Sequence, residues 1–228
     1  MTPDLPLVLL TLLGAVLGLD AVSFPQAMLS RPIVAATLGG AVVGDAYSGL
    51  LAGATLELVA LETLPVGASR YPEWGSASVV AGGLIGSYGQ MSAGALSVTI
   101  FAAIATGWIG GWTMVQLRGT NATMARRLRP AINAGSPNAV VGLQFAGLFA
   151  DFVRGGVLTL LALLAFNPLM RAALGVWGAN PRYSRAVAVA VAASVASGAV
   201  WKLFRSTAGA RWYLLGGLAL GLLAMAYA

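Results

Sequence analysis

The chain has 228 residues, of which 58% are hydrophobic and only 9% charged, and its mean hydropathy is +0.84. A soluble domain carries roughly 25% charged residues, so this chain has too few charges to cover a surface that faces water. The net charge of +6 is modest and is explained by membrane topology, which argues against a nucleic-acid partner. The composition therefore predicts an integral membrane protein that spans the lipid bilayer several times.

Thirty glycines are the second unusual feature. Glycine lets membrane helices approach one another closely, and helices satisfy their own backbone hydrogen bonds in hydrocarbon. We expect an all-α, polytopic helical membrane protein that forms a single domain over residues 1–228.

The sequence contains no cysteine and no histidine. These absences exclude disulfides, thiolate nucleophiles, imidazole bases and phosphohistidine on this chain. We therefore expect no catalytic residue, no metal site and no cofactor.

The sequence of the N-terminal half predicts one membrane span followed by several interrupted apolar segments. Residues 5–19 are the first expected span, and residues 33–44, 46–64 and 77–85 follow it. Residues 33–44 are too few for the ~20 that a full crossing needs. Short, glycine-interrupted segments are typical of broken or re-entrant helices around a transport site, which makes residues 20–90 the candidate substrate region.

The C-terminal half has longer apolar stretches at residues 93–117, 140–166, 186–201 and 212–228. Residues 118–138 lie between the first two stretches and contain four arginines. This composition predicts a basic polar loop at the cytoplasmic face. Tryptophans near the span ends are expected to lie at the membrane interface: Trp108, Trp112, Trp201 and Trp212.

Charged residues within a membrane are costly and suggest function. Asp45 and Glu57 are separated by three helical turns, with Gly49 and Gly53 between them on the same face. We expect at least one of the two acids to bind a small polar ligand; the alternative is that the glycines pack and Asp45 caps a helix. Asp151 and Arg154 are three residues apart, which predicts a structural ion pair.

Several ordered motifs resemble the enzyme IIC subunits of the mannose/fructose/sorbose phosphotransferase (PTS) family. The similar segments are Ser30-Arg31-Pro32-Ile33-Val34, residues 38–45 ending in Gly44-Asp45, residues 48–58 ending in Leu56-Glu57-Leu58, Val66-Gly67-Ala68-Ser69 with Pro72-Glu73, and more weakly residues 148–155. The similarity is strongest over about residues 18–90.

The resemblance implies a permease subunit that carries a hexose or related sugar across the inner (plasma) membrane by an elevator or rocking motion. It implies a IID membrane subunit, soluble IIA and IIB components that carry the phosphate, and a homo-oligomer within the complex. The chain alone would then not be an enzyme. The residues that match family positions near the sugar are Gln26, Asp45, Glu57, Gly67, Ala68 and Ser69.

Two other functions fit the same residues. An ion-coupled secondary transporter would use Asp45 and Glu57 as ion ligands. A sensor or scaffold that does not transport would have the same fold and bind a regulator.

Overall fold

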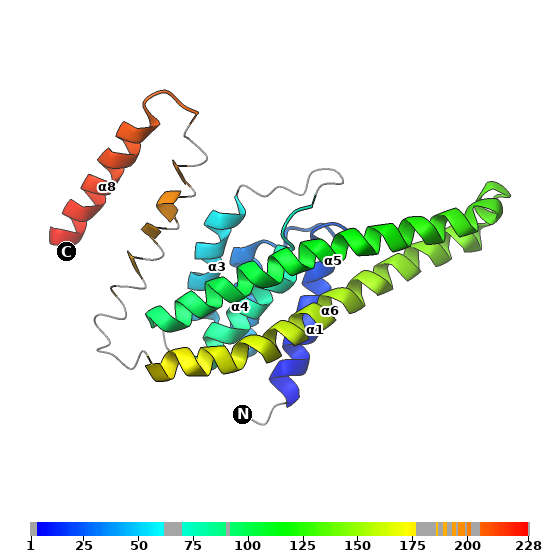
Figure 1. Ribbon diagram of the computed structural model, residues 1–228, viewed down its shortest axis with the longest axis horizontal. Coiled ribbons are helices and arrows are strands. Elements are labelled where there is room, and N and C mark those ends of the chain that lie inside the picture. The colour runs from blue at the N-terminus through cyan, green and yellow to red at the C-terminus, as the bar shows by residue number, and fades with distance from the viewer. Residues whose placement is uncertain are drawn as a thin grey trace.

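The structure is a computed structural model that describes residues 4–61, 70–89, 92–176 and 206–227, with isolated residues between 186 and 201. Seven helices are defined in the described part, and no strand occurs there (Figure 1). Their bounds are α1 Asp4–Asp20, α2 Pro32–Val42, α3 Ala46–Ala60, α4 Trp74–Tyr88, α5 Ala93–Asn133, α6 Pro137–Val176 and α8 Ala210–Tyr227. The prediction of an all-helical fold with short helices in the N-terminal half is confirmed.

The short helices begin and end where the sequence provides caps. Pro32 occupies the first turn of α2, where its missing N–H costs nothing. The carboxylates of Asp45 and Glu73 cap α3 and α4 by accepting hydrogen bonds from the amides of Ser48 and Ser76, at 2.9 and 3.0 Å. With 11 and 15 residues, α2 and α3 are roughly 17 and 23 Å long, less than the ~30 Å of a hydrocarbon core.

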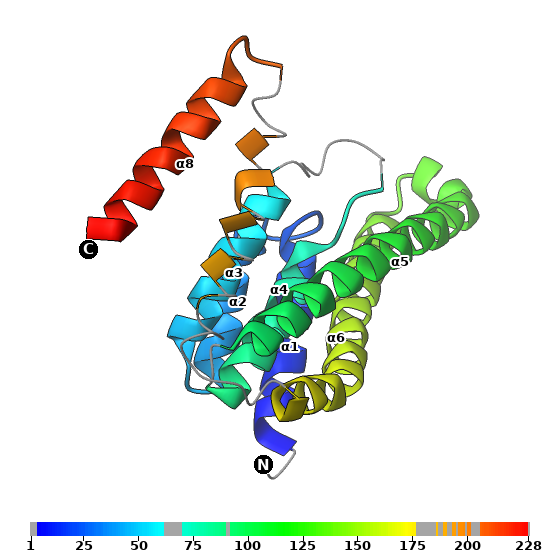
Figure 2. The ribbon, with the colours of Figure 1, turned by 60° about the vertical axis from the view of Figure 1, so that its left-hand side comes forward.

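Glycines bring the short helices into backbone contact. A Cβ built on Gly40 of α2 would lie 3.0 Å from the Cα of Gly49 on α3, and one built on Gly82 of α4 would lie 1.9 Å from the carbonyl oxygen of Ala36 on α2. The three helices form one cluster, with α4 between α2 and the long helices (Figure 2). Small residues thus replace the interlocking of large side chains that packs helices in water.

The two long helices α5 and α6 run side by side, and α1 packs on α6 (Figure 1). They have 41 and 40 residues, or roughly 60 Å each, and their connected ends project beyond the rest of the bundle. We call residues 118–149, the segment that includes this projection, the arm. These two helices are long and apolar enough to cross a membrane.

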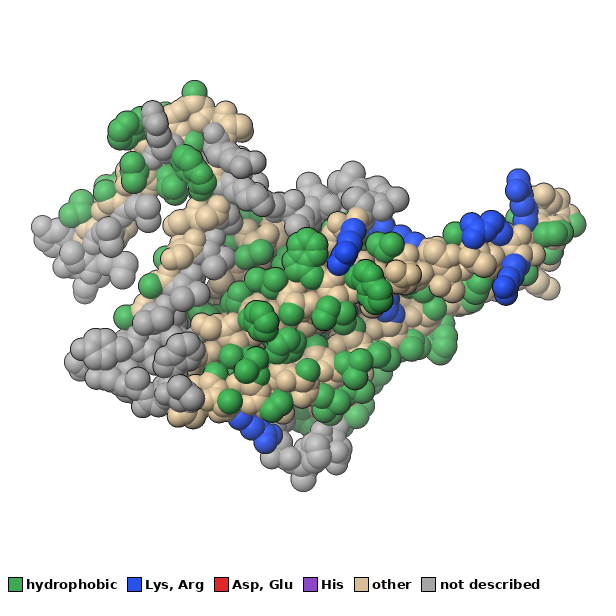
Figure 3. Space-filling view, viewed as in Figure 1, with side chains coloured by type: hydrophobic (Ala, Val, Ile, Leu, Met, Phe, Trp, Pro, Cys, Tyr) green, Lys and Arg blue, Asp and Glu red, His purple; other side chains and the backbone are tan. Residues whose placement is uncertain are grey.

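The arm corrects one expectation. Residues 118–138 were expected to form a loop, but α5 continues to Asn133 and α6 begins at Pro137. Arginine, alanine, leucine and methionine in this stretch favour helix, so its charge marks a polar helix surface and not an irregular segment. Figure 3 shows the basic side chains gathered along the projecting part of α5.

Of the expected span at residues 186–201 the structure describes only scattered residues, and those are helical. The expected span at 212–228 corresponds to α8, which stands apart from the main bundle in Figure 1.

Candidate substrate site

A cavity of about 330 Å³ lined by both polar and apolar side chains lies where α1 ends, α2 begins and the chain enters α4. Its walls include Asp20, Gln26, Ser30, Arg31, Tyr71 and Trp74. Gln26, Ser30 and Arg31 come from the connection between α1 and α2, and Asp20 is the last residue of α1. The cavity thus falls within the candidate substrate region expected from the sequence.

Asp20, at the C-terminal end of α1, organises the wall formed by residues 21–31. Its carboxylate is 1% exposed and accepts hydrogen bonds from the amides of Ala27 and Ser30, both at 2.7 Å. Gln26 and Met28, the two neighbours of Ala27 in the chain, have φ angles of 60° and 61°. Left-handed backbone costs about 1–3 kcal/mol at a residue other than glycine, so the two bonds to Asp20 hold a wall that would otherwise relax.

The Gln26 side chain is exposed beside the cavity. Its amide nitrogen donates to the carbonyl oxygen of Val22 at 2.8 Å, which fixes the amide group and leaves its oxygen as an acceptor. The structure therefore places this sequence-predicted residue at the site.

Arg31 and Glu57 form an ion pair behind the cavity. The Arg31 Nε donates to Glu57 Oε1 at 2.7 Å, Nη2 contacts the same oxygen, and the other carboxylate oxygen accepts from the amide of Ile33 at 3.1 Å. Glu57 on α3 therefore satisfies an amide in the first turn of α2 and holds Arg31 at the cavity. Its place in the site is through Arg31, since Glu57 itself does not line the cavity.

Tyr71 and Trp74 form the aromatic wall. Both are 9% exposed. The Tyr71 hydroxyl accepts a hydrogen bond from Arg118 at 2.6 Å, and the Arg118 guanidinium lies 5.3 Å from the Tyr71 ring centre. This aromatic wall is thereby tied to α5 where the arm begins.

A buried charge cluster supports the cavity from α6. Arg154 Nε donates to Asp151 Oδ1 at 2.8 Å, which confirms the expected ion pair, and Arg154 Nη1 lies 3.9 Å from Glu73 Oε2. The Ser23 hydroxyl contacts Asp151. Ser23 and Glu73 belong to the two chain segments that line the cavity, so the cluster links both walls to α6.

Among the other predicted site residues, Asp45 does not line this cavity. Asp45 caps α3 at the end opposite Glu57, roughly 18 Å away for twelve residues of helix. Its role as a sugar ligand stays a prediction that this arrangement does not support. Gly67, Ala68 and Ser69 lie outside the described residues.

Sequence reasoning did not select Asp20, Arg31, Tyr71 or Trp74 as site residues. Asp20 carries the clearest signal, because an acid at the end of an apolar span precedes a segment with Pro25 and Pro32. Among the residues that the structure describes, no group of three potential ligands could hold a metal ion.

These features define a class: an all-helical membrane protein whose N-terminal half consists of short helices around a cavity with polar and apolar walls. The chain matches the family described as PTS system sorbose-specific IIC component over residues 5–182, and it belongs to that family. The predicted family resemblance is confirmed.

Two relatives illustrate the range of the family. The fructose permease IIC component of Bacillus subtilis (strain 168) is 28% identical over 172 residues, which cover 75% of this chain and 62% of that one. The mannose-specific EIIC component of Escherichia coli (strain K12) is 27% identical over 152 residues, or 66% of this chain and 54% of that one. The matches thus span little more than half the length of each relative.

The fold is shared with solved membrane proteins. A cryo-EM structure of the mannose transporter ManYZ in complex with microcin E492 gives a TM-score of 0.62 at 21% identity, covering 98% of this chain and 87% of the matched chain. A second solved membrane protein gives 0.68, also at 21% identity, with 100% and 94% covered.

Proposed function

We propose that this chain is the membrane permease subunit of a phosphoenolpyruvate-dependent sugar phosphotransferase system and that it binds a hexose or related sugar in the cavity beside Gln26. The observation that carries the proposal is the cavity itself, which lies within the part of the chain that matches the family. At about 330 Å³ it falls at the lower end of the ~300–1,000 Å³ typical of ligand sites. That size suits a single sugar ring.

The lining suits a neutral polyol. The Gln26 amide accepts and donates hydrogen bonds, and Arg31 donates several without needing an anionic ligand. The apolar C–H face of a sugar ring can lie against the aromatic wall of Tyr71 and Trp74. Because these groups are fixed, an epimer with a misplaced hydroxyl would leave some of them unpaired, and this gives specificity.

The proposed transport system consists of several proteins with separate roles. This chain has no histidine, so a phosphohistidine relay would lie on soluble IIA and IIB components, and the chain alone would not be an enzyme. A IID membrane subunit would complete the permease, within a complex that also contains further copies of this chain. The complex would lie in the inner (plasma) membrane, which this chain crosses several times.

Uptake into proteoliposomes tests the proposal. The chain is purified with the membrane subunit that accompanies it, and radiolabelled hexoses are supplied outside. We expect uptake and sugar phosphate inside only when the soluble components and phosphoenolpyruvate are present. Uptake driven by a proton or sodium gradient alone would establish the secondary transporter instead, and sugar binding without uptake under every condition would establish the sensor.

A matched pair of variants tests the location of the site. Gln26→Ala removes the exposed amide at the cavity, and Gln144→Ala removes an exposed amide on the arm. We expect sugar affinity to fall roughly tenfold in the first, as for the loss of a hydrogen bond or two, and to stay unchanged in the second. Equal affinities would contradict the assignment of the cavity.

A further inference from the structure

A second cavity, of about 360 Å³, lies between α1, α4 and α6. It contacts the first turns of α1, whereas the candidate sugar cavity lies at the last residue of that helix. None of its lining residues belongs to the sugar cavity. The proposed function therefore leaves it without a role.

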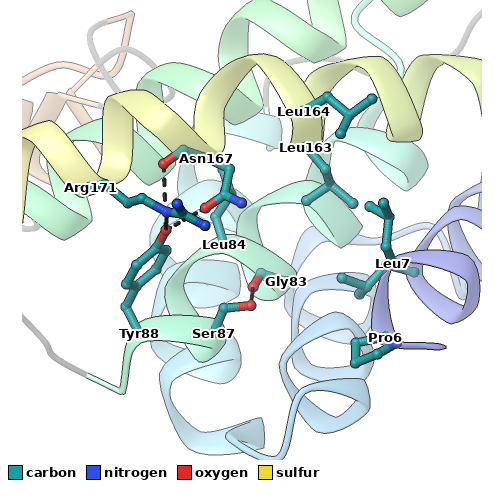
Figure 4. A pocket seen from close by; sticks show the side chains of 11 residues that line it. Pro6, Leu7, Gly83, Leu84, Ser87, Tyr88, Leu163, Leu164, Asn167 and Arg171 are labelled. Atoms are coloured by element: carbon teal, nitrogen blue, oxygen red, sulfur yellow. Dashed lines mark hydrogen bonds between the residues drawn. The ribbon is translucent and has the colours of Figure 1, made fainter. Parts of the chain in front are cut away.

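The cavity has an apolar part and a polar end, as Figure 4 shows. Leucines from α1, α4 and α6 form the apolar part: Leu7, Leu10, Leu84, Leu163 and Leu164. Tyr88, Asn167 and Arg171 gather at the polar end. Leu164 is 54% exposed, so the apolar part opens on the outside of the bundle, where the lipid would be.

The polar end is a connected group of donors. The Tyr88 hydroxyl contacts the side-chain oxygen of Asn167 and accepts a hydrogen bond from Arg171 Nε at 3.2 Å. Asn167 therefore turns its oxygen toward Tyr88, and its NH₂ group remains a donor. Arg171 forms no ion pair within the described part of the chain. Its side chain is exposed, and the bond through Nε leaves the two terminal nitrogens of the guanidinium to bind an anion.

Arg171 lies in the last two turns of α6, a helix that is long and apolar enough to cross a membrane. It follows Arg154 of the buried charge cluster by seventeen residues, or roughly 26 Å of helix. Arginines near the ends of membrane helices extend toward the headgroups of the lipid. A ligand bound here would have its charged group at the headgroups and its apolar part among the leucines.

We propose that this cavity binds an anionic phospholipid. One acyl chain would lie against the leucines of the apolar part, and the phosphate would accept hydrogen bonds from Arg171 and Asn167. A sugar in this cavity would place its hydroxyls against the leucines, where they would have no hydrogen-bond partners. A simple anion would leave the apolar part of the cavity empty. An anionic amphiphile satisfies both parts of the cavity at once.

Native mass spectrometry of the full chain, purified in mild detergent and stripped of lipid, tests this proposal. Phosphatidylglycerol and phosphatidylcholine with identical acyl chains are added back, each also in the presence of excess inorganic phosphate. We expect phosphatidylglycerol to bind at least several-fold more tightly and to resist displacement by phosphate. Arg171→Gln should weaken its binding roughly tenfold, because a charge-assisted contact is lost, and Arg171→Lys should retain part of it.

Two further variants keep the test specific. Arg129→Gln removes the same charge from an exposed position on the arm and should leave lipid binding unchanged. Leu164→Trp places a bulky ring at the mouth of the apolar part and should lower the affinity for both lipids. Protein folding is checked by the thermal unfolding of each variant in detergent.

Three results would overturn the proposal. Equal affinity for the two lipids would show that binding does not depend on the charge of the headgroup. Displacement of phosphatidylglycerol by inorganic phosphate alone would identify a site for a free anion. Protection of the cavity by a co-purified membrane subunit, with no lipid bound, would show that the cavity is a protein interface.

Discussion

Glu57 on α3 binds both the side chain of Arg31 and the backbone amide of Ile33, so one carboxylate joins two helices at the edge of the candidate sugar cavity. The Arg31 and Glu57 side chains are 26% and 19% exposed. An ion pair that is this well covered, with an added amide contact, contributes more than one on an open surface. It fixes Arg31, a cavity residue, against the α2–α3 hairpin.

Glu57→Gln should weaken both the fold and the site. Glutamine can still accept from the Ile33 amide, but it leaves Arg31 without a counter-charge. We expect the free energy of unfolding to fall by about 1–3 kcal/mol and sugar affinity to fall with it, measured by thermal unfolding and sugar binding on the same preparation. A loss of stability with full sugar affinity would contradict the positioning of Arg31 by Glu57.

Asp20→Asn should disturb the cavity wall. Asparagine has only one oxygen to replace two acceptors, so one of the Ala27 and Ser30 amides would face an NH₂ group. We expect about 1–3 kcal/mol of destabilisation and release of the residues with positive φ, read out as faster proteolysis within residues 21–31 together with weaker sugar binding. An unchanged cleavage rate would show that other contacts hold this wall.

Asp45→Ala separates the structural from the ligand role of Asp45. Loss of a helix cap costs about 1 kcal/mol, so a small fall in thermal stability is expected. Because Asp45 lies at the far end of α3 from Glu57, sugar affinity should not change. Abolished binding in a folded variant would instead support the ligand role predicted from the sequence.

Arg154→Leu should be the most damaging of the charge substitutions. It would leave Asp151 and Glu73, both at most 2% exposed, without their shared cation. Breaking a buried pair in this way costs about 3–5 kcal/mol, so little folded protein should reach the membrane. Adding Asp151→Asn should restore part of the folded yield, measured by fluorescence-detected gel filtration; no recovery would argue against the ion pair as the cause.

Gly82→Ala and Gly119→Ala form a matched pair. A Cβ at Gly82 would overlap the Ala36 carbonyl oxygen at 1.9 Å, whereas none of the described atoms lies within 4 Å of a Cβ at Gly119. The first should separate α4 from α2 and prevent folding. The second should be neutral or stabilising by up to about 1 kcal/mol, as alanine favours helix. Thermal unfolding and membrane yield distinguish the two, and equal behaviour would contradict the close packing.

The sequence was most informative where composition and helix length decide the structure. The scarcity of charge predicts the membrane class, and the short apolar pieces at residues 33–44 and 77–85 correctly predict the short helices α2 and α4. The Asp151–Arg154 pair follows from helical spacing alone. The prediction of a loop at residues 118–138 was wrong, because a polar composition was interpreted as irregular structure although these residues favour helix.

The site was harder to predict, because it is built from contacts that are distant along the chain. Periodicity placed Asp45 and Glu57 on one face, three turns apart, but could not show that Asp45 caps α3 and that Glu57 pairs with Arg31. Asp20 acts through backbone amides seven and ten residues away, a geometry that requires the folded connection. Tyr71 becomes a cavity wall only because the chain before α4 returns to the end of α1.

The shortness of α2 and α3 has a consequence for water. A hairpin about 17–23 Å long within a hydrocarbon layer of ~30 Å has at least one end that stops inside the layer. Helix ends carry amides and carbonyls without partners in the helix, and lipid offers them none. Asp45 and Glu57 satisfy one amide each at the starts of α3 and α2, and the groups that remain need water, another part of the chain or a neighbouring subunit, so that the hairpin divides the thickness of the membrane into a lipid-facing part and a part that lipid does not wet.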